Sequence, residues 1–97
     1  MFLKIHRSPG SADVIAICDA ELLNTTITHG DLKVQVHDSF YGTRRVNTDD
    51  VREALKKGDS INLMGERTVA IAVELGLIER KDCIMIGHVP HVQIYSL

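Results

Sequence analysis

The segment Asn62–Arg67 contains the first residues whose types and spacing suit the binding of a ligand. A glycine at position 65, between an apolar strand and a helix, lets backbone N–H groups point outward where the helix starts. Such helix N-termini bind phosphate or carboxylate groups, and Arg67 could assist. The segment is not a P-loop or a Gly-x-Gly-x-x-Gly motif, and Glu66 would repel an anion, so a plain strand-to-helix turn is the alternative. The candidates for an anion- or ligand-binding site here are Asn62, Gly65, Glu66 and Arg67.

A second candidate site lies at Gly87–His91, where two histidines three residues apart flank a rigid turn. Ligands of open α/β sheets collect at the carboxyl ends of strands, and Gly65 and His88 would share one such edge. A histidine there could shuttle a proton, contact an anion or bind a metal. In the alternative interpretation, His88 caps a turn and His91 is a surface residue of a strand. The candidates here are His88, Pro90 and His91.

Metal-dependent and conventional catalytic sites are not indicated by the sequence. A zinc site needs three or four ligands, and only Cys83 lies near the two histidines, so we expect no metal and no cofactor. There is no Gly-x-Ser-x-Gly motif, and Asp49 and Asp50 have the positions of helix-capping acids. Proton transfer by His91 with Glu66 remains an alternative to a non-catalytic role.

A third, weaker candidate is the segment Phe40–Arg45, in which aromatic residues precede two arginines. An aromatic ring beside paired arginines can stack a base and hold phosphates, which indicates a secondary nucleic-acid contact by Tyr41, Arg44 and Arg45. A turn with solvated charges is the alternative, because the Tyr41 ring and two arginines make a small footprint for a nucleic-acid site.

Composition restricts these hypotheses further. The 97 residues suffice for one domain, which we assign to positions 1–97, and the proportions of 44% hydrophobic and 25% charged residues are those of a globular protein. The net charge of −2 argues against unspecific binding of nucleic acid, although it permits a local basic patch. The longest apolar runs have five residues, against about 20 for a membrane span, so we expect a cytoplasmic protein with no membrane partner. Its two cysteines are expected to be free thiols.

The first half of the chain is expected to consist mainly of strands. Turn chemistry at Ser8–Ser11 predicts a hairpin between the first two of them. Asp19 is expected to cap a single helical turn ending at Leu23. Alternating apolar residues predict a half-buried strand over 32–37, and Asn47 with Asp49 and Asp50 predicts the start of a short surface helix. In order, the expected segments are strands Phe2–His6 and Val14–Cys18, a loop over 24–31, strand 32–37, a turn at 41–42 and a helix over 47–57.

The second half of the chain is expected to form a βαβ unit. Ser60–Met64 is expected to be a strand, and Glu66–Leu75 a helix that ends at Gly76. This helix is apolar on most sides, so it should be buried on the sheet and could also pack on a second copy of the protein. Cys83–Ile86 is apolar on both faces and is expected to be a central strand. After a turn over 87–90, a last strand is expected over His91–Ser96. The predicted fold is a single small α/β domain, a mixed sheet of about five or six strands with an N-terminal hairpin and one C-terminal βαβ unit.

Three segments together resemble a known family. Phe40-Tyr41-Gly42, then Gly65-Glu66-Arg67-Thr68-Val69 with Gly76-Leu77-Ile78, then Val89-Pro90-His91-Val92-Gln93 are similar in order and spacing to the archaeal family catalogued as domain of unknown function 424. The resemblance covers nearly the whole chain and implies an archaeal cytosolic protein, but no activity. Thr43, Arg44 and Arg45 depart from the family pattern. The resemblance therefore shifts weight from the arginine pair toward Gly65–Arg67, Pro90 and His91.

These observations favour a non-catalytic binding module, whose expected partner is RNA or a ribonucleoprotein. The segments Gly65–Arg67 and His88–His91 would form one recognition edge. The first alternative is a small-ligand enzyme or sensor that uses His91 and Glu66. The second is a structural module that forms homo-oligomers through the 66–75 helix.

Overall fold

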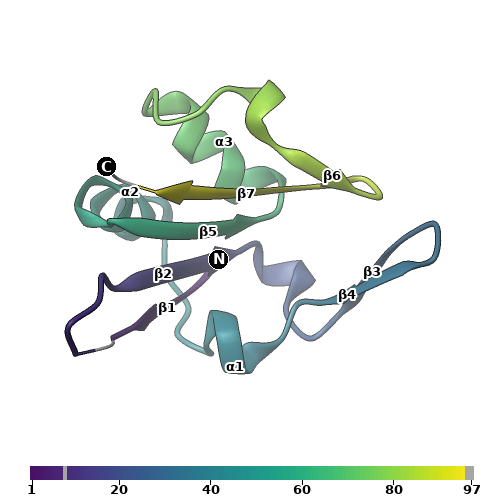
Figure 1. Cartoon of the computed structure of the whole chain (residues 1–97), viewed down its shortest axis with the longest axis horizontal. Helices are drawn as coiled ribbons and strands as arrows, with labels where there is room; N and C mark the ends of the chain where they lie inside the picture. Colours follow the sequence, from purple (N-terminus) through teal and green to yellow (C-terminus); the bar gives the residue numbers. More distant parts are fainter. Residues whose placement is uncertain (8, 96–97) are drawn as a thin grey trace.

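The computed structural model describes residues 1–7 and 9–95, which form the strands and helices shown in Figure 1. Ser8 of the predicted turn and Ser96 of the predicted last strand lie outside the described residues. In chain order, the elements are β1 (Phe2–His6), β2 (Val14–Cys18), the 3₁₀ helix η1 (Ala20–Leu22), β3 (Thr26–His29), β4 (Leu32–Gln35), α1 (Asp38–Tyr41), α2 (Thr48–Lys57), β5 (Ser60–Met64), α3 (Glu66–Glu74), the 3₁₀ helix η2 (Arg80–Asp82), β6 (Ile84–Ile86) and β7 (Val89–Tyr95).

Five of the strands form a mixed sheet in the order β1-β2-β5-β7-β6. The hairpin of β1 and β2 is antiparallel, β2 and β5 are parallel, and β7 runs antiparallel to both β5 and β6. The predicted α/β class, mixed sheet and N-terminal hairpin are therefore confirmed. The strands of the βαβ unit, β5 and β6, are parallel as predicted, but β7 lies between them.

Helices α2 and α3 cover one face of this sheet (Figure 1). Successive side chains of a strand point to opposite faces, so alternate residues of each strand meet these helices. Val51 and Leu55 of α2 and Val69, Ile71 and Ala72 of α3 are buried against the sheet. The strands contribute Leu3, Ile15, Ile17, Ile61, Leu63 and Val92 to the same core.

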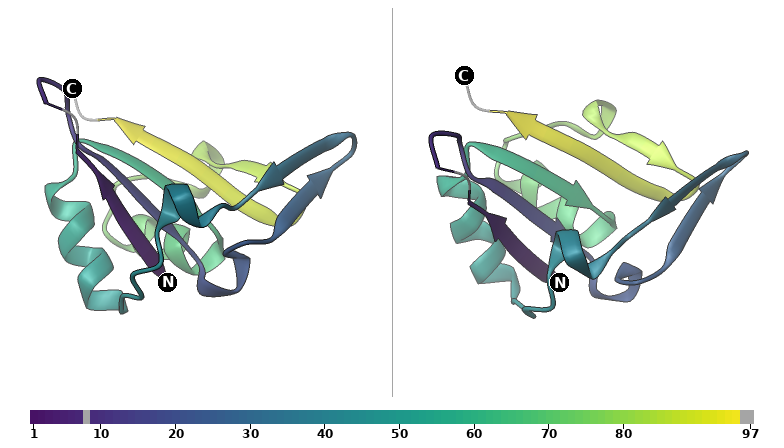
Figure 2. Two further views of the ribbon diagram at one scale, coloured as in Figure 1. Left: turned by 90° about the horizontal axis from the view of Figure 1, so that it is seen from below. Right: turned by 60° about the horizontal axis from the view of Figure 1, so that its bottom comes forward.

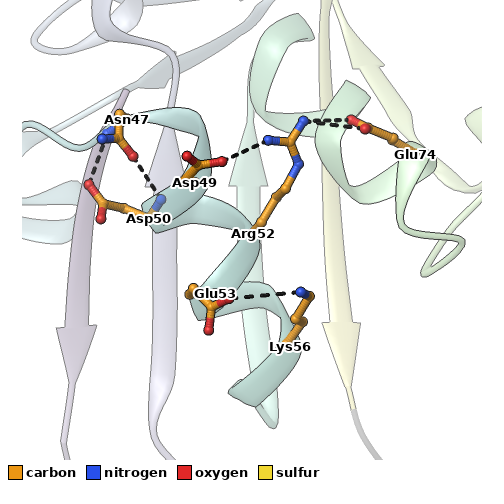
Figure 3. A network of polar contacts seen from close by, with 7 residues as sticks. All are labelled: Asn47, Asp49, Asp50, Arg52, Glu53, Lys56 and Glu74. Atoms are coloured by element: carbon orange, nitrogen blue, oxygen red, sulfur yellow. Dashed lines mark hydrogen bonds and ion pairs between the residues drawn. The ribbon is translucent and has the colours of Figure 1, made fainter.

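The predicted surface helix is α2, and its polar contacts are local apart from one link to α3 (Figure 3). Asn47 and Asp50 form a reciprocal capping box, in which each side chain accepts the backbone N–H of the other residue. Arg52 donates to Asp49 at 3.1 Å and to both carboxylate oxygens of Glu74 at 3.2 and 3.3 Å. Arg52 therefore connects the exposed sides of the two helices.

The opposite face of the sheet is covered only in part, by η1, α1 and the β3–β4 hairpin (Figure 2). Ala16, Cys18 and Met64 of this face are buried beneath these elements, together with Ile86. Tyr41 of α1, Ile27 of β3 and Val36 complete this second cluster. Helix α1 packs on β1 and β2, where Phe40 contacts His6, and η1 follows the end of β2.

Residues 24–37 differ from their prediction. Strand β3 lies within the predicted loop, and β4 ends at Gln35 rather than at His37. The two strands form a separate antiparallel hairpin, in which Ile27 is the only buried residue. One buried apolar residue is too weak a periodic signal for a strand. His37 instead caps α1, because its Nδ1 accepts the Ser39 N–H at 3.1 Å.

The segment Cys83–Ile86 is not the central strand that its composition predicted. Strand β6 lies at the edge of the sheet, where Ile84 is 67% and Met85 49% exposed. The place beside β5 belongs to β7, which returns through a turn of only two residues, Gly87 and His88. Pro90, predicted to be part of the turn, lies in β7.

Among the described residues, no helix is long and apolar enough to cross a membrane.

Candidate binding surface

The N-terminus of α3, predicted to bind an external anion, is bonded to a carboxylate of the chain itself. Strand β2 ends beside β5, and the N–H of Asp19 donates to the carbonyl of Met64 at 3.0 Å. The Asp19 carboxylate accepts the N–H of Arg67 at 3.0 Å, the N–H of Thr68 at 2.8 Å and the Thr68 hydroxyl at 2.7 Å. Asp19 is only 2% exposed. The residue predicted to cap η1 therefore makes no side-chain bond there and caps α3 instead.

The contact between Asp19 and the start of α3 requires a glycine at position 65. Its φ is +116°, and a methyl group at its Cα would lie 2.4 Å from Cγ of Asp19. The Gly65 N–H donates to the carbonyl of Pro90 at 2.9 Å, and Nδ1 of His91 bonds to the carbonyl of Leu63 at 2.8 Å. The structure thus brings Gly65, Pro90 and His91 to one edge of the sheet. The contacts that join them are hydrogen bonds of the scaffold.

The side chains of Glu66 and Arg67 lie on the surface in separate ion pairs. Glu66 contacts Arg80, and Arg67 lies 3.5 Å from Glu21. His91 belongs to the set of β7 residues that faces away from the helices, because its neighbour Val92 faces the core of α2 and α3. Among residues 1–7 and 9–95, no hydrogen bond or ion pair joins His91 to Glu66. The geometry does not assemble the acid–base pair of the enzyme hypothesis.

His88 is exposed at the tip of the β6–β7 turn. The preceding residue, Gly87, donates its N–H to Nδ1 of His29 at 2.9 Å, so this turn is attached to the β3–β4 hairpin. A methyl group at Gly87 would lie 2.8 Å from the carbonyl oxygen of Thr28. His88 is therefore held in place by its neighbours, while its own ring remains accessible.

Tyr41 is a core residue rather than a platform for stacking a base. Its ring is 4% exposed, and its hydroxyl donates to Oδ1 of Asn62 at 2.8 Å. Burial raises the pKa of this phenol well above its ordinary range. Phe40, which precedes it, stacks on His6 with ring centroids 4.9 Å apart. The aromatic ring that sequence reasoning paired with Arg44 and Arg45 is thus directed inward.

The arginine pair runs alongside β1. The Leu3 N–H donates to the carbonyl of Arg44 at 3.2 Å, and the guanidinium of Arg45 lies 5.1 Å from the centre of the Phe2 ring. Gly42 permits this close approach, since a methyl group there would lie 3.0 Å from Cβ of Lys4. Arg44 and Arg45 form no ion pair with any residue in the described part of the chain.

A shallow groove of about 480 Å³ is lined by residues of this segment, of β1 and of α1, and we call it the basic groove. Its lining contains three cations and one acid, whereas the whole chain has a net charge of −2. Sequence reasoning missed Lys4 and Arg7, because only the pairing of β1 with residues 44–46 brings them beside Arg44. The lining residues are Leu3, Lys4, Ile5, Arg7, Asp38, Gly42, Thr43 and Arg44.

A second hollow, of about 310 Å³, lies at the other side of the sheet, where β7 extends beyond the start of β6. His91 and Gln93 line it together with Asp82, Ile84 and Val92. His91 is half-buried, and Gln93 and Ile84 are exposed. This hollow contains one of the predicted site residues but none of the Gly65–Arg67 segment.

Metal-binding and thiol chemistry find no support in the arrangement of side chains. Within residues 1–7 and 9–95, no three His, Cys, Asp or Glu side chains are grouped so that they could hold a metal ion. Both cysteines are free thiols. Burial, with a smaller effect of Asp19, raises the pKa of Cys18 to about 12, and burial also raises the pKa of Cys83. Neither thiol is activated as a nucleophile.

Comparison with known proteins agrees with the resemblance noted in the sequence. The family model described as "Protein of unknown function (DUF424)" matches residues 6–97. The crystal structure of an uncharacterized conserved protein from Methanopyrus kandleri is similar, with a TM-score of 0.81 and 30% identity over 99% of this chain and 90% of that chain. No curated protein matches the chain. The predicted family is therefore confirmed, and the chain belongs to the DUF424 family of proteins of unknown function.

Proposed function

We propose that this protein is a non-catalytic binding module whose ligand is single-stranded RNA, either free or within a ribonucleoprotein. The observation that carries this proposal is the basic groove, in which Lys4, Arg7 and Arg44 surround about 480 Å³ of open space. Phosphate groups are the ligands that such a set of cations binds best, and guanidinium groups can bind them in a bidentate manner. The cytoplasmic location predicted from the sequence fits this ligand and stays a prediction.

The charges around the groove are available to a ligand to different degrees. Arg44 has no acidic partner among the described residues, whereas Arg7 lies 3.5 Å from Asp13 in an exposed pair. Lys4 donates to the carbonyl of Ser39 at 2.9 Å, which directs its ammonium group toward α1 and the groove. Exposed ion pairs are weak, so a phosphate can compete with Asp13 for Arg7. We therefore expect Arg44 to contribute most to binding.

The residues first predicted as the recognition edge enter this proposal as secondary contacts. Arg67 and His88 are exposed, and His91 is half-buried beside the second hollow. Gly65 and Pro90 act through the backbone hydrogen bond that joins β7 to the start of α3. If the edge contacts RNA, Arg67→Ala and His91→Ala will weaken the complex in addition to the effect of the groove.

A direct binding experiment tests the proposal. A fluorescein-labelled single-stranded RNA of mixed sequence is titrated with the protein, and binding is followed by fluorescence anisotropy. The test variant combines Lys4→Gln, Arg7→Gln and Arg44→Gln. The matched control combines Lys33→Gln, Lys56→Gln and Lys81→Gln, which removes the same charge from exposed positions outside the groove. We expect the test variant to lose binding and the control to retain most of it. Equal losses in both variants would contradict a specific role of the groove.

The two alternatives are less favoured by the geometry. An enzyme or sensor that uses His91 and Glu66 needs a pocket shared by both residues, but Glu66 contacts Arg80, and the hollow beside His91 does not include Glu66. Homo-oligomers through the 66–75 helix need an accessible apolar face. Val69, Ile71 and Ala72 are instead buried within the chain. Sedimentation at high protein concentration tests this second alternative, and a stable dimer disrupted by Val73→Glu would support it.

A further inference from the structure

The sheet face opposite α2 and α3 carries side chains in rows that the strand registers define, and α1 covers the β2 part of these rows, where Ala16 is fully buried. One row contains His6, Val14, Ser60 and Tyr95, which are cross-strand neighbours across β1, β2, β5 and β7. The next row contains Lys4, Ala16, Asn62 and Gln93. At the β1 side these rows adjoin α1 and the basic groove, whereas at the β7 side Gln93 is exposed and Tyr95 is 66% exposed. Figure 2 shows that no helix covers the end of β7 on this face.

Asn62 and Gln93, the two amide side chains of this sheet face, have hydrogen-bonded oxygens and unpaired NH₂ groups within the described residues. The Tyr41 hydroxyl donates to Oδ1 of Asn62, and the Tyr95 hydroxyl donates to Oε1 of Gln93. Within the described residues, no hydrogen bond uses either amide nitrogen. Asn62 and Gln93 are direct cross-strand partners, so their Cβ atoms lie about 5 Å apart. Two NH₂ groups at adjacent positions of the sheet are therefore available to donate to a ligand.

His91 adds an acceptor beside these donors. Its Nδ1 bonds to the carbonyl of Leu63, which can only accept a hydrogen bond, so Nδ1 carries the proton. In the neutral ring, Nε2 then carries the lone pair. His91 lies two residues from Gln93 on the same face of β7. The four residues Asn62, His91, Gln93 and Tyr95 form what we call the platform, which combines an exposed ring, two donors and one acceptor.

We propose that the platform binds one base of the RNA, with the base stacked on Tyr95 and its edge hydrogen-bonded to the amides of Asn62 and Gln93. This inference rests on the function proposed above. Among the bases, cytosine matches the platform best, because its adjacent acceptors N3 and O2 can accept from the two NH₂ groups. Its amino group can donate to Nε2 of His91.

Charge indicates why the platform takes a base and the basic groove takes phosphates. Asp82 lines the hollow beside His91, and a phosphate there would be repelled by its carboxylate. Lys4 and Gln93 stand in one row of the sheet, separated by three strand spacings or about 14 Å. Helix α1 and the buried Tyr41 lie between them over Ala16, so a strand of RNA that contacts both the cations at β1 and the platform at β7 must pass over α1. The cations complement its backbone, and the neutral donors complement the edge of a base.

The test compares labelled oligonucleotides of cytidine, uridine and adenosine, each eight nucleotides long, by fluorescence anisotropy at fixed salt. We expect the cytidine oligomer to bind most tightly. Tyr95→Ala should weaken its binding by roughly 5- to 150-fold, the range typical of one stacked base. Tyr95→Phe keeps the ring but removes the hydroxyl that holds the Gln93 amide, so it should weaken binding much less than Tyr95→Ala. Gln93→Leu should reduce the preference for cytidine over adenosine. Because Tyr95 and Gln93 are exposed, we expect their variants to fold like the wild-type protein. Circular dichroism of each variant checks this expectation.

Tyrosine fluorescence gives a second readout without a label. The chain has two tyrosines and no tryptophan, and Tyr41 is buried. Stacking of a base on Tyr95 should quench the emission of the wild-type protein, and the same oligomer should quench Tyr95→Phe far less. Equal affinity for the three oligomers, with no effect of Tyr95→Ala, would overturn the platform while the groove variant still tests the proposed function. Failure of all oligomers to bind the wild-type protein would overturn both.

Discussion

The Asp19 carboxylate accepts two hydrogen bonds from Thr68, one from its N–H at 2.8 Å and one from its hydroxyl at 2.7 Å, across 49 residues of sequence. Both residues are buried. The pair fixes the end of β2 to the start of α3, and it gives the helix N-terminus the negative charge that its dipole favours. The position at which an external anion was predicted is therefore a structural junction of the fold.

Removal of this carboxylate should destabilise the protein strongly. Asp19→Ala deletes an N-cap and leaves the buried N–H and hydroxyl of Thr68 without a partner. We expect the free energy of unfolding to fall by roughly 2–4 kcal/mol in urea denaturation. In a double-mutant cycle, Thr68→Val added to Asp19→Ala should cost much less than in the wild-type background. Asp31→Ala, at an exposed turn, is the control and should stay within about 0.5 kcal/mol of the wild-type protein.

A pair of glycine substitutions separates backbone strain from steric collision. Both Gly65 and Gly76 have positive φ, +116° and +75°, but a methyl group at Gly76 would meet no atom within 4 Å. At Gly65 it would collide with the Asp19 side chain. We expect Gly76→Ala to lower the free energy of unfolding by about 1 kcal/mol and Gly65→Ala by at least about 3 kcal/mol. Similar losses at the two positions would show that the Asp19 side chain moves aside easily.

Stability should fall at high pH because of Cys18. Its thiol has a pKa of about 12 in the folded protein, against an ordinary value of 9.0. Between these values the unfolded chain releases this proton and the folded chain retains it, so the free energy of unfolding decreases as pH rises. The contribution is complete below pH 9 and should decrease by roughly 1–4 kcal/mol toward pH 12. Burial also raises the pKa of Tyr41, so the free energy of unfolding is measured against pH for both the wild-type protein and Cys18→Ala, and its decrease with pH should be shallower in the variant. Equal slopes would contradict the assignment.

Segments with strong local signals were predictable from the sequence. The hairpin of β1 and β2, the N-cap of α2 at Asn47 and the buried helix α3 each depend on residues close together in the chain, and the structure confirms them. The sequence also predicted that the segments of Gly65 and of Pro90 and His91 share one edge of the sheet, and hydrogen bonds join these segments in the structure.

Other features depend on contacts that local patterns do not encode. The role of Asp19 depends on a partner 49 residues away, and a local cap was the natural interpretation. Strand β6 has the composition of a central strand but lies at the edge, because β7 returns through a two-residue turn and occupies the place between β5 and β6. The basic groove needs Arg44 to lie along β1, which only the folded chain reveals. The sequence therefore predicts the elements better than it predicts the site.

The salt dependence of RNA binding tests the central claim most directly. Affinity for a labelled single-stranded RNA is measured by fluorescence anisotropy from low to physiological salt, for the wild-type protein and for Arg44→Gln. If the basic groove holds about three phosphates, the logarithm of affinity should fall with the logarithm of salt concentration with a slope of about −2, and Arg44→Gln should make this slope shallower by about 0.7. No measurable RNA binding at low salt, or a slope unchanged by Arg44→Gln, would contradict the claim that this groove binds RNA.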